Sequence, residues 1–550
     1  MIFNTTKRPS ARQIKHCSIP VYGILHFGLN TFVNKEWGYG DTPPEVFNPV
    51  DFDPEQIAAA CENGGIGGLI VVCKHHDGFC LWPTQTTGYC VSNTKWNRDY
   101  VGELSRALRR HGVRVGFYVS PWDRNCAAYG TVEYLKIFKE QLREVLTGYG
   151  EAFEVWFDGA NGGDGYYGGS CEKKTIDSGN YYDWENIWQM VRELQPGAAI
   201  FSDVGPDLRW VGNEKGFAAP DSRASFTPVG KSSLYPGCLD YCNSPQGDLN
   251  GVYYMPPECD FPLRPGWFYH QNENDRLKSV AELIEIYGHS VGRGGFMNIG
   301  LVLNEKGVMP EADVRRLAEF KAARESLYQN TVFQEDERPV VDGKCVIALG
   351  KDTAVNFIEL KEPLAGGEQV TAYAVEAGSH GRWRQVCSGK SIGINRICRF
   401  AVVNADAVRI KIIDSSGKVN RLSVRICLAP EMFQNDASGM PKNYLPLSRT
   451  KVSGMELMAE LPEPFRFKGV VFTPDKDHVA GTPLNCSLAV LENGKWRIVA
   501  ETEFSNIRAN PIPQTVEFPC VTASAIKLTA IRLVDNSGEI TCKELGVLTY

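Results

Sequence analysis

Residues 66–79 read IGGLIVVCKHHDGF, an apolar run of strand length that leads directly into charged and polar residues. A strand that is apolar at every position is typical of a parallel sheet with both faces covered by helices. The same pattern recurs in VYGILHFGLN at 21–30, VRVGFYVSPWD at 113–123, EAFEVWFDGAN at 151–161 and AAIFSDVGPD at 198–207, and a further strand, GGFMNIG, is predicted at 294–300. These repeated strands with polar ends decide the fold class.

Amphipathic helical patterns lie between these strands. Asp53 precedes Pro54 at the start of one such pattern, and Gln56 would complete a capping box. Asp99 and Thr131 begin two more, and PEADVRRLAEFKAARESL at 310–327 is the last. Strands that alternate with helices in this way predict a (β/α)8-like barrel of the TIM type, whose functional residues follow the strand ends on one rim.

The pattern changes after about residue 331. Short β-rich segments separated by turns then predict antiparallel sandwiches, and the clearest hairpin is LAVLENGKWRIV at 488–499, with its turn at Asn493 and Gly494. A polar stretch, FQNDASGMPKNYLPLSRT at 433–450, is typical of a linker. We therefore expect a catalytic barrel over 1–331, a β-sandwich over 332–432 and a second β-sandwich over 433–550.

Composition narrows the functional class. The chain has 550 residues, and 58 Lys and Arg against 65 Asp and Glu give a formal net charge of −7, which does not favour a nucleic-acid partner. The longest apolar run is far shorter than the roughly 20 residues of a membrane helix. The 17 cysteines lack repeated spacing, and the first residues hold no signal-peptide core. We expect a cytoplasmic protein, or a secreted one if residues before Met1 have been removed. The sequence leaves the oligomeric state open.

The polar residues at the strand ends are interleaved with Trp and Tyr. For any one of them, solvation of a loop is an equally good interpretation, but the repetition favours a shared site. Aromatic rings cover the apolar face of a sugar, His and Arg bond its hydroxyls, and paired carboxylates perform glycosidic chemistry. The candidates in this pattern are His26, Glu36, Trp37, His75, His76, Tyr118, Trp156, Asp158, Arg209, Trp210 and Glu214.

Several motifs in order make the sequence recognisable. They are HFGLNTF at 26–32, KHHDGF at 74–79, SPWDRN at 120–125, WFDGA at 156–160 and GPDLRWVGNEKG at 205–216. Over roughly residues 15–330 the chain resembles the α-L-fucosidases of glycoside hydrolase family 29. The last motif, with PPECDFPLRPGWFYH at 256–270, resembles the subfamily selective for α-1,3- and α-1,4-linked fucose.

This resemblance implies an exo-acting, retaining enzyme that hydrolyses terminal fucose from oligosaccharides without a cofactor. Asp158 matches the nucleophile of the family, and a helix-capping role is the alternative for it. Glu214 matches the acid/base of the selective subfamily. Glu258 is the rival for that role, or a residue near the departing sugar, and Asp203 and Asp207 are weaker candidates.

The resemblance also implies contacts to the substrate. His26, His75 and His76 match residues that bond the fucose hydroxyls, Glu36 and Trp37 match a loop that reaches the same sugar, and Tyr118 and Trp156 line the site. Arg209 and Trp210 either shape the acid/base loop and the leaving-group site or are structural. Trp267 and Arg264 are candidates for contact with a branched leaving group.

Other interpretations of the site and of the last β unit stay open. Adjacent side chains on a strand point to opposite faces, so His75 and His76 would seldom bind one ion, and we expect no catalytic metal. A structural metal, a fucosidase of broad specificity and a non-catalytic fucose-binding protein remain alternatives. The closing strands of the last β unit resemble a discoidin-type carbohydrate-binding module, and that unit either binds sugar or supports the barrel.

Overall fold

The computed structural model describes residues 2–4, 6–228, 235–237, 244–431, 444–476, 478–535 and 537–549. The chain divides into two compact units, residues 1–437 and 438–550. The boundary expected between residues 432 and 433, and most of the expected linker, lie outside the described residues. Within the described part of the chain, no helix is both long and apolar enough to cross a membrane.

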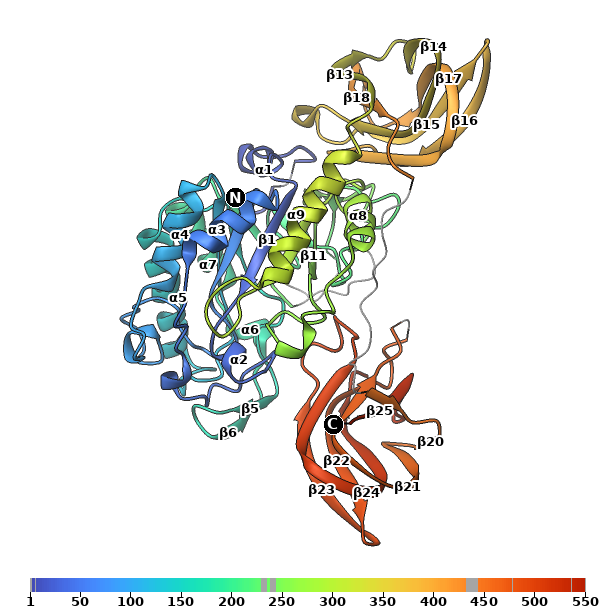
Figure 1. The fold of residues 1–550 in the computed structure, drawn as a ribbon. Helices are drawn as coiled ribbons and strands as arrows, with labels where there is room; N and C mark the ends of the chain where they lie inside the picture. Colours follow the sequence, from blue (N-terminus) through green and yellow to red (C-terminus); the bar gives the residue numbers. More distant parts are fainter. Residues whose placement is uncertain are drawn as a thin grey trace. The chain divides into compact units, whose positions relative to one another are not determined.

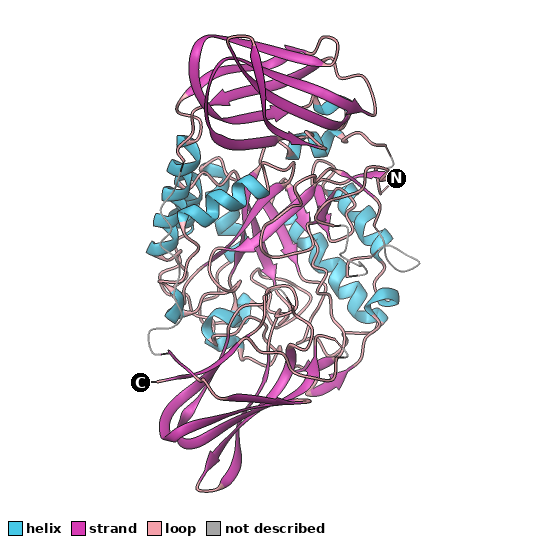
Figure 2. Ribbon diagram, turned by 90° about the vertical axis from the view of Figure 1, so that its right-hand side faces the viewer, coloured by secondary structure: helices cyan, strands magenta, loops and turns pink. Residues whose placement is uncertain are grey.

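The first unit contains a closed barrel of eight parallel strands, which confirms the predicted fold class. The strands follow one another around the barrel in the order β1-β12-β11-β8-β7-β4-β3-β2. Figure 2 shows these strands at the centre of the unit with helices around them. The strands are β1 (Val21–His26), β2 (Gly68–Lys74), β3 (Arg114–Val119), β4 (Glu154–Trp156), β7 (Ala199–Ser202), β8 (Leu208–Trp210), β11 (Pro257–Pro262) and β12 (Phe296–Val302).

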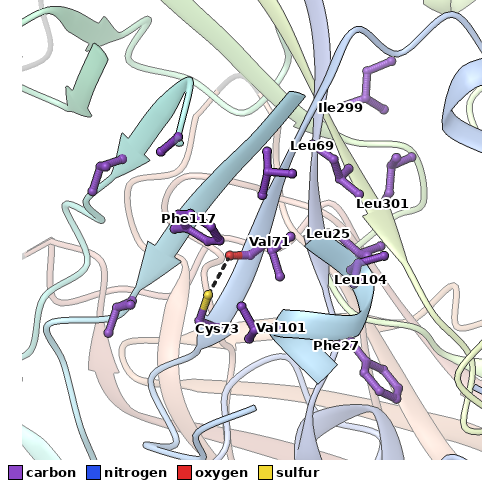
Figure 3. Close-up of a cluster of buried hydrophobic side chains, with 14 of the residues drawn as sticks. Leu25, Phe27, Leu69, Val71, Cys73, Val101, Leu104, Phe117, Ile299 and Leu301 are labelled. Atoms are coloured by element: carbon purple, nitrogen blue, oxygen red, sulfur yellow. Dashed lines mark hydrogen bonds between the residues drawn. The ribbon is translucent and has the colours of Figure 1, made fainter. Parts of the chain in front are cut away.

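Both faces of β2 and of its neighbours β1 and β3 are largely apolar because each face has its own core. Leu69 and Val71 of β2 pack outward with Phe117, Val101 and Leu104, between the strands and helix α4 (Tyr100–Arg110; Figure 3). The alternate residues of the same strands form a second cluster inside the barrel, which includes Tyr22, Ile24, Ile70, Val72, Tyr118, Trp156 and Phe201. This double burial explains the unbroken apolar runs in the sequence.

The helices begin where their caps predict, with one difference. Asp53 accepts hydrogen bonds from the amides of Glu55 and Gln56 at the start of α3 (Pro54–Asn63). The Gln56 side chain does not complete a capping box; it bonds the backbone of Met309 in both directions, at 3.0 Å each. The remaining helices are α1 (Ala11–His16), α2 (Leu29–Phe32), α5 (Val132–Gly148), α6 (Ser178–Tyr181), α7 (Trp184–Leu194), α8 (Val280–His289) and α9 (Glu311–Ser326).

Two barrel strands, β8 and β11, are absent from the predicted set. Strand β11 reads PECDFP, with proline at both ends and two buried acidic residues, so it carries no apolar signal. Among the described residues, no α-helix lies between β7 and β11. A long connection with a short two-stranded antiparallel sheet, β9 (Ser225–Phe226) and β10 (Tyr253–Tyr254), stands in the place of a helix there. Another small hairpin, β5 (Gly165–Tyr167) and β6 (Glu172–Lys174), follows β4.

The rest of the first unit is an antiparallel sheet of order β13-β18-β14-β17-β15-β16 (Figure 1). Its long strands carry register shifts, and its inner side chains form a core of their own. We call this part the β-sandwich. Its strands are β13 (Thr331–Pro339), β14 (Lys344–Lys361), β15 (Val370–Ser379), β16 (Arg382–Gly389), β17 (Arg396–Ser415) and β18 (Arg421–Cys427).

The second unit is also an antiparallel β structure with its own apolar core. The predicted hairpin joins β22 to β23, and its turn residues Asn493 and Gly494 both have positive φ, at 49° and 76°. That conformation is the one a two-residue type I′ turn requires, which is why Asn-Gly is favoured there. The strands are β19 (Tyr444–Pro446), β20 (Thr450–Ser453), β21 (Glu456–Thr473), β22 (Pro483–Glu492), β23 (Lys495–Glu503), β24 (Gln514–Leu533) and β25 (Glu544–Leu548).

Candidate active site

Asp158 lies two residues beyond the end of β4, at the carboxyl rim of the barrel. One carboxylate oxygen, Oδ1, accepts a hydrogen bond from the Ala160 amide (2.8 Å). The other, Oδ2, accepts one from the Tyr118 hydroxyl (2.9 Å) and lies 3.5 Å from Nε2 of His76. The Asp158 side chain keeps 21% of its surface exposed. The carboxylate is therefore held in one orientation and still open on one side.

The environment of Asp158 also sets its charge. Burial raises its pKa to about 6, while the hydrogen bonds from Ala160 and Tyr118 act in the opposite direction because they favour the ionised form. Asp158 is accordingly ionised at neutral pH and has lost part of its hydration. A carboxylate in that state can act as a nucleophile.

His76 stands beside Asp158 as a neutral ring. Its Nδ1 lies 2.8 Å from the Ser120 hydroxyl, which itself donates to the Trp122 carbonyl (2.9 Å). Because the single Ser120 proton goes to the carbonyl, Nδ1 carries the hydrogen and donates it to Ser120. Burial, with Arg124 nearby, lowers the pKa of His76 well below its usual value. Its Nε2 thus keeps a lone pair that can accept a hydrogen bond from a sugar hydroxyl.

His26 and His75 continue the same group of rings. The two imidazole centroids are 5.5 Å apart, and His75 lies 4.1 Å from His76. Phe268 contacts both His26 (5.3 Å) and His75 (4.9 Å) edge to face. Burial lowers the pKa of His26 to about 4 and that of His75 well below its usual value. The structure brings together all three histidines that the sequence selected, each neutral at physiological pH.

Glu214 follows β8 and meets Trp267 from a distant part of the chain. The indole Nε1 of Trp267 donates to Oε2 of Glu214 (2.8 Å). The same indole lies 5.2 Å from the His26 ring and rests on Gly300 of β12, where an added Cβ would stand only 2.6 Å from it. Trp267 therefore connects Glu214 to the histidine group.

Glu36 holds the backbone on which Trp267 lies. Its two oxygens accept hydrogen bonds from the amides of Trp267 (2.8 Å) and Phe268 (3.0 Å), and from His270 (2.8 Å). Burial opposes its charge, but the bonds from His270, Trp267 and Phe268 outweigh that effect and lower the pKa of Glu36. The resemblance predicts that Glu36 lies on a loop that reaches the sugar. In the structure the hydrogen bonds of Glu36 hold the backbone at Trp267 and Phe268.

Aromatic rings close the remaining sides of the group. Trp37 contacts His76 edge to face at 5.4 Å and Trp122 at the same distance. Trp156 meets Tyr118 at 5.1 Å. Trp210 is half-buried at the end of β8, and its indole donates to Oδ1 of Asp260 (2.5 Å). These rings supply the apolar surfaces on which a sugar ring can lie.

Glu258 differs from its expected place. It is fully buried inside the barrel, where its oxygens accept hydrogen bonds from Trp156 Nε1 (2.8 Å), Asn298 Nδ2 (2.8 Å) and the Tyr22 hydroxyl (2.5 Å). Burial and the neighbouring Glu154 raise the pKa of Glu258 well above its usual value. Glu258 has no exposed surface in this structure and its contacts lie inside the barrel; its roles as the rival acid/base or as a contact to the departing sugar stay predictions.

Arg209 and Arg264 are both buried and bonded within the protein. Arg209 donates to the carbonyls of Ser244 (3.1 Å), Arg223 (3.0 Å) and Met255, so it ties together the long connection between β8 and β11 that bears Glu214. These contacts agree with the alternative in which Arg209 shapes the acid/base loop. Arg264 forms a buried pair with Asp313 through two hydrogen bonds, at 3.0 and 2.6 Å, and its contact with a branched leaving group stays a prediction.

Among the acidic candidates, Asp203 lies near Asp158 and Asp207 does not. Asp203 accepts two hydrogen bonds from the Gly237 amide, and burial, with Asp158 nearby, raises its pKa to about 7. Asp207 bonds Arg192 (2.6 Å) and the Ile200 amide (2.8 Å). Sequence reasoning missed Asp260, which fixes Trp210; its spacing of two from Glu258 in β11 was the available signal, because residues two apart share a strand face.

Comparison with known proteins points to one family. A family model described as α-L-fucosidase matches residues 22–322. An α-L-fucosidase 1 of Arabidopsis thaliana is 32% identical over 481 residues, which cover 80% of this chain and 90% of that protein. A putative α-L-fucosidase 1 of Oryza sativa subsp. japonica is 34% identical over 74% of this chain and 82% of that protein.

Solved structures agree with these sequence relatives. A glycoside hydrolase family 29 member from an unknown rumen bacterium superposes with a TM-score of 0.72 at 33% identity, over 98% of this chain and 99% of that one. A Ruminococcus gnavus fucosidase of family 29, determined in complex with fucose, superposes with a TM-score of 0.66 at 26% identity, over 78% of this chain and 96% of that one.

Proposed function

Because the chain belongs to the α-L-fucosidases of glycoside hydrolase family 29, we propose that it removes terminal α-1,3- or α-1,4-linked fucose from oligosaccharides with retention of configuration. The observation that carries the proposal is the arrangement around Asp158, an ionised, partly exposed carboxylate beside neutral histidines at the barrel rim. Glu214 supplies the second carboxyl group, and its contact with Trp267 orients it.

In the first step, Asp158 attacks the anomeric carbon of the fucoside. The bond to the glycosidic oxygen breaks as the bond to the Asp158 oxygen forms, and Glu214 delivers a proton to the departing oxygen. The products of this step are the shortened oligosaccharide and a fucosyl ester on Asp158 with inverted configuration. The hydrogen bonds from Tyr118 and Ala160 orient the attacking carboxylate.

In the second step, water replaces the oligosaccharide. Glu214, now ionised, removes a proton from the water as the water oxygen attacks the anomeric carbon. The ester bond to Asp158 breaks, and fucose leaves with the configuration it had in the substrate. The lone pair on Nε2 of His76 and the rings of His26 and His75 are suited to hold the sugar hydroxyls through both steps.

The proposed preference for 1,3 and 1,4 linkages is based on the residues near the departing sugar. The motif GPDLRWVGNEKG at 205–216 resembles that of the selective subfamily, and it places Trp210 and Glu214 on one connection. Trp210 is held by Asp260, and Trp267 by Glu36, so two indoles are fixed near the acid/base. Rigid rings of this kind favour leaving groups with a matching apolar face.

Three measurements test the mechanism. Asp158→Ala should lower kcat/KM on the order of 10⁴-fold for every fucoside, as loss of a member of a covalent catalytic unit does. Mass spectrometry of the wild-type protein with a slow fucoside should find a fucosyl adduct on Asp158. NMR of the first-formed product should show α-fucose; β-fucose would exclude a retaining mechanism.

A linkage panel separates the finer alternatives. Fucose release from 1,2-, 1,3-, 1,4- and 1,6-linked glycans should be fastest for the 1,3 and 1,4 linkages. Comparable rates on all four would identify a fucosidase of broad specificity. Binding of fucosides without turnover by the intact wild-type chain would instead support the non-catalytic alternative.

A further inference from the structure

The loop that bears Glu214 is rigid at its tip. Oδ1 of Asn213 accepts hydrogen bonds from the amides of Lys215 (3.1 Å) and Phe217 (3.3 Å), and Nδ2 of Asn213 donates to the Phe217 carbonyl (2.9 Å). These three bonds close the turn over residues 213–217 on itself. The position of Glu214 therefore also depends on what holds the residues that follow the turn.

The residues directly after the turn, Phe217 and Ala218, are attached to the barrel. The Ala218 amide donates to the carbonyl of His289, the last residue of α8 (2.9 Å), and Arg293 donates to the Ala218 carbonyl. The Phe217 ring meets the His289 ring edge to face at 4.8 Å. Arg209 holds the carbonyl of Arg223 further along, at 3.0 Å.

The far end of the loop, residues 220–224, is attached to the β-sandwich. Arg396, the first residue of β17, donates to the carbonyls of Pro220 (2.6 Å) and Ser222 (3.1 Å). Glu368 accepts a hydrogen bond from the Ala224 amide (2.9 Å). These bonds join parts of the chain that lie more than 140 residues apart in the sequence.

The attachment by Arg396 is a buried one. Arg396 is 5% exposed, and burial of a guanidinium is costly where its donors find no acceptor. The two loop carbonyls accept hydrogen bonds from its two terminal nitrogens, while Nε has no partner among the described residues. The next residue, Ile397, donates its amide to the Gly292 carbonyl (2.9 Å) in the turn after α8. The start of β17 thus contacts both the loop and the helix end to which the loop is attached.

We propose that the β-sandwich positions the acid/base: Arg396, helped by Glu368, fixes residues 220–224 so that Glu214 stays within reach of the glycosidic oxygen. Arg396 is a positioning residue in this account, since it acts through the loop. The inference rests on the proposed role of Glu214. It assigns to the β-sandwich a part in one proton transfer, in addition to its part in stability.

The expected consequence depends on the leaving group. Proton transfer needs the donor within hydrogen-bond distance, and a displacement of about 1 Å can cost about 10²-fold in rate. An activated aryl leaving group departs without a proton, whereas a sugar does not. A displaced Glu214 should therefore slow the release of fucose from glycans and leave aryl fucosides almost unaffected.

Arg396→Met tests the proposal, because it keeps most of the apolar stem and removes the donors. Arg399→Met is the matched control: Arg399 is exposed on the same strand and donates to Pro430 within the sandwich (2.8 Å). For Arg396→Met we expect kcat/KM on a 1,3/1,4-fucosylated trisaccharide to fall about 10- to 100-fold, with a change of about threefold or less on a 4-nitrophenyl fucoside. Arg399→Met should leave both values unchanged.

The ratio of the two activities in one preparation does not depend on the fraction of folded protein, so partial misfolding cannot imitate the result. Equal losses on both substrates, or no loss on either, would overturn the positioning role. Glu214→Ala keeps the two proposals distinguishable. If it shows a strong leaving-group dependence and Arg396→Met does not, only the inference fails. If Glu214→Ala shows none, the acid/base assignment fails and the inference fails with it.

Discussion

At the scale of single residues, the candidate nucleophile and a carboxyl group buried inside the barrel have opposite surroundings. Asp158 is held by hydrogen bonds to its ionised form, while the buried Glu258 beneath it is bonded among Trp156, Tyr22 and Asn298. Trp156 connects the two carboxyl groups. Its indole donates to Glu258, and its ring contacts Tyr118, which bonds Asp158. The chemistry of each group follows from its partners.

Tyr118→Phe should change the pH dependence of the reaction. Burial holds the pKa of Asp158 at about 6, and the Tyr118 hydroxyl opposes that rise by stabilising the ionised form. Without the hydroxyl the pKa should increase by about one to two units, because a hydrogen bond to a charged group contributes about 1.5–3 kcal/mol. The acid limb of kcat/KM for an aryl fucoside should therefore move to higher pH. A limb at the wild-type position would show that the bond does not control the nucleophile.

Glu258→Ala should weaken the barrel and the sugar site together. The substitution leaves the donors of Trp156, Asn298 and Tyr22 buried without an acceptor, at about 1–3 kcal/mol each. We expect a clear drop in the thermal midpoint and similar losses of kcat/KM on glycans and aryl fucosides. A loss confined to glycans would return Glu258 to the acid/base role.

At the scale of elements, β12 and the connection before it control Trp267. The apolar runs of β1, β2, β3, β4 and β7 were predictable because both of their faces are buried. Strand β11 was not, since it carries Glu258 and Asp260, which hold Trp156 and Trp210. Strand β8 was not, because it has only three residues with Arg209 in the middle. Polar residues in a barrel strand conceal the strand from a search for hydrophobic runs, and in this chain they support the candidate site.

Gly300→Ala in β12 tests this element. An added Cβ would stand 2.6 Å from the Trp267 ring and 3.0 Å from Pro262, so the indole must move and its bond to Glu214 must lengthen. We expect a loss of about 10-fold or more on glycans and a smaller loss on aryl fucosides. Gly288→Ala is the control, because no atom lies within 4 Å of the added Cβ. Unchanged glycan activity in Gly300→Ala would show that Trp267 does not orient Glu214.

At the scale of the whole molecule, the first unit carries several buried carboxyl groups whose pKa values burial raises. They are Glu154, to about 8, and Asp77, Asp203 and Glu368, each to about 7. In the folded protein these groups keep protons that the unfolded chain loses near pH 4 to 4.5. Between those two sets of pKa values the folded state therefore binds more protons than the unfolded chain, and the stability of the folded state decreases as pH rises.

The thermal midpoint of the full chain should accordingly fall between about pH 5 and pH 8. Glu154→Gln should flatten part of that slope, because the amide has no proton to lose. Differential scanning calorimetry at several pH values provides the measurement. A midpoint that rises over this interval would show that the ion pairs of the unit outweigh its buried carboxyl groups.

The barrel, the hairpin at Asn493–Gly494 and the place of Asp158 after a strand could be predicted from local sequence patterns, because each pattern involves residues only a few positions apart. The partners of the buried polar groups could not be predicted, because they come from distant parts of the chain. Trp267 meets Glu214 across 53 residues, and Arg396 reaches Pro220 across 176. Barrel closure turned Glu258 inward and buried Arg209, since a polar side chain inside a protein must find its hydrogen-bond partners wherever the fold brings them.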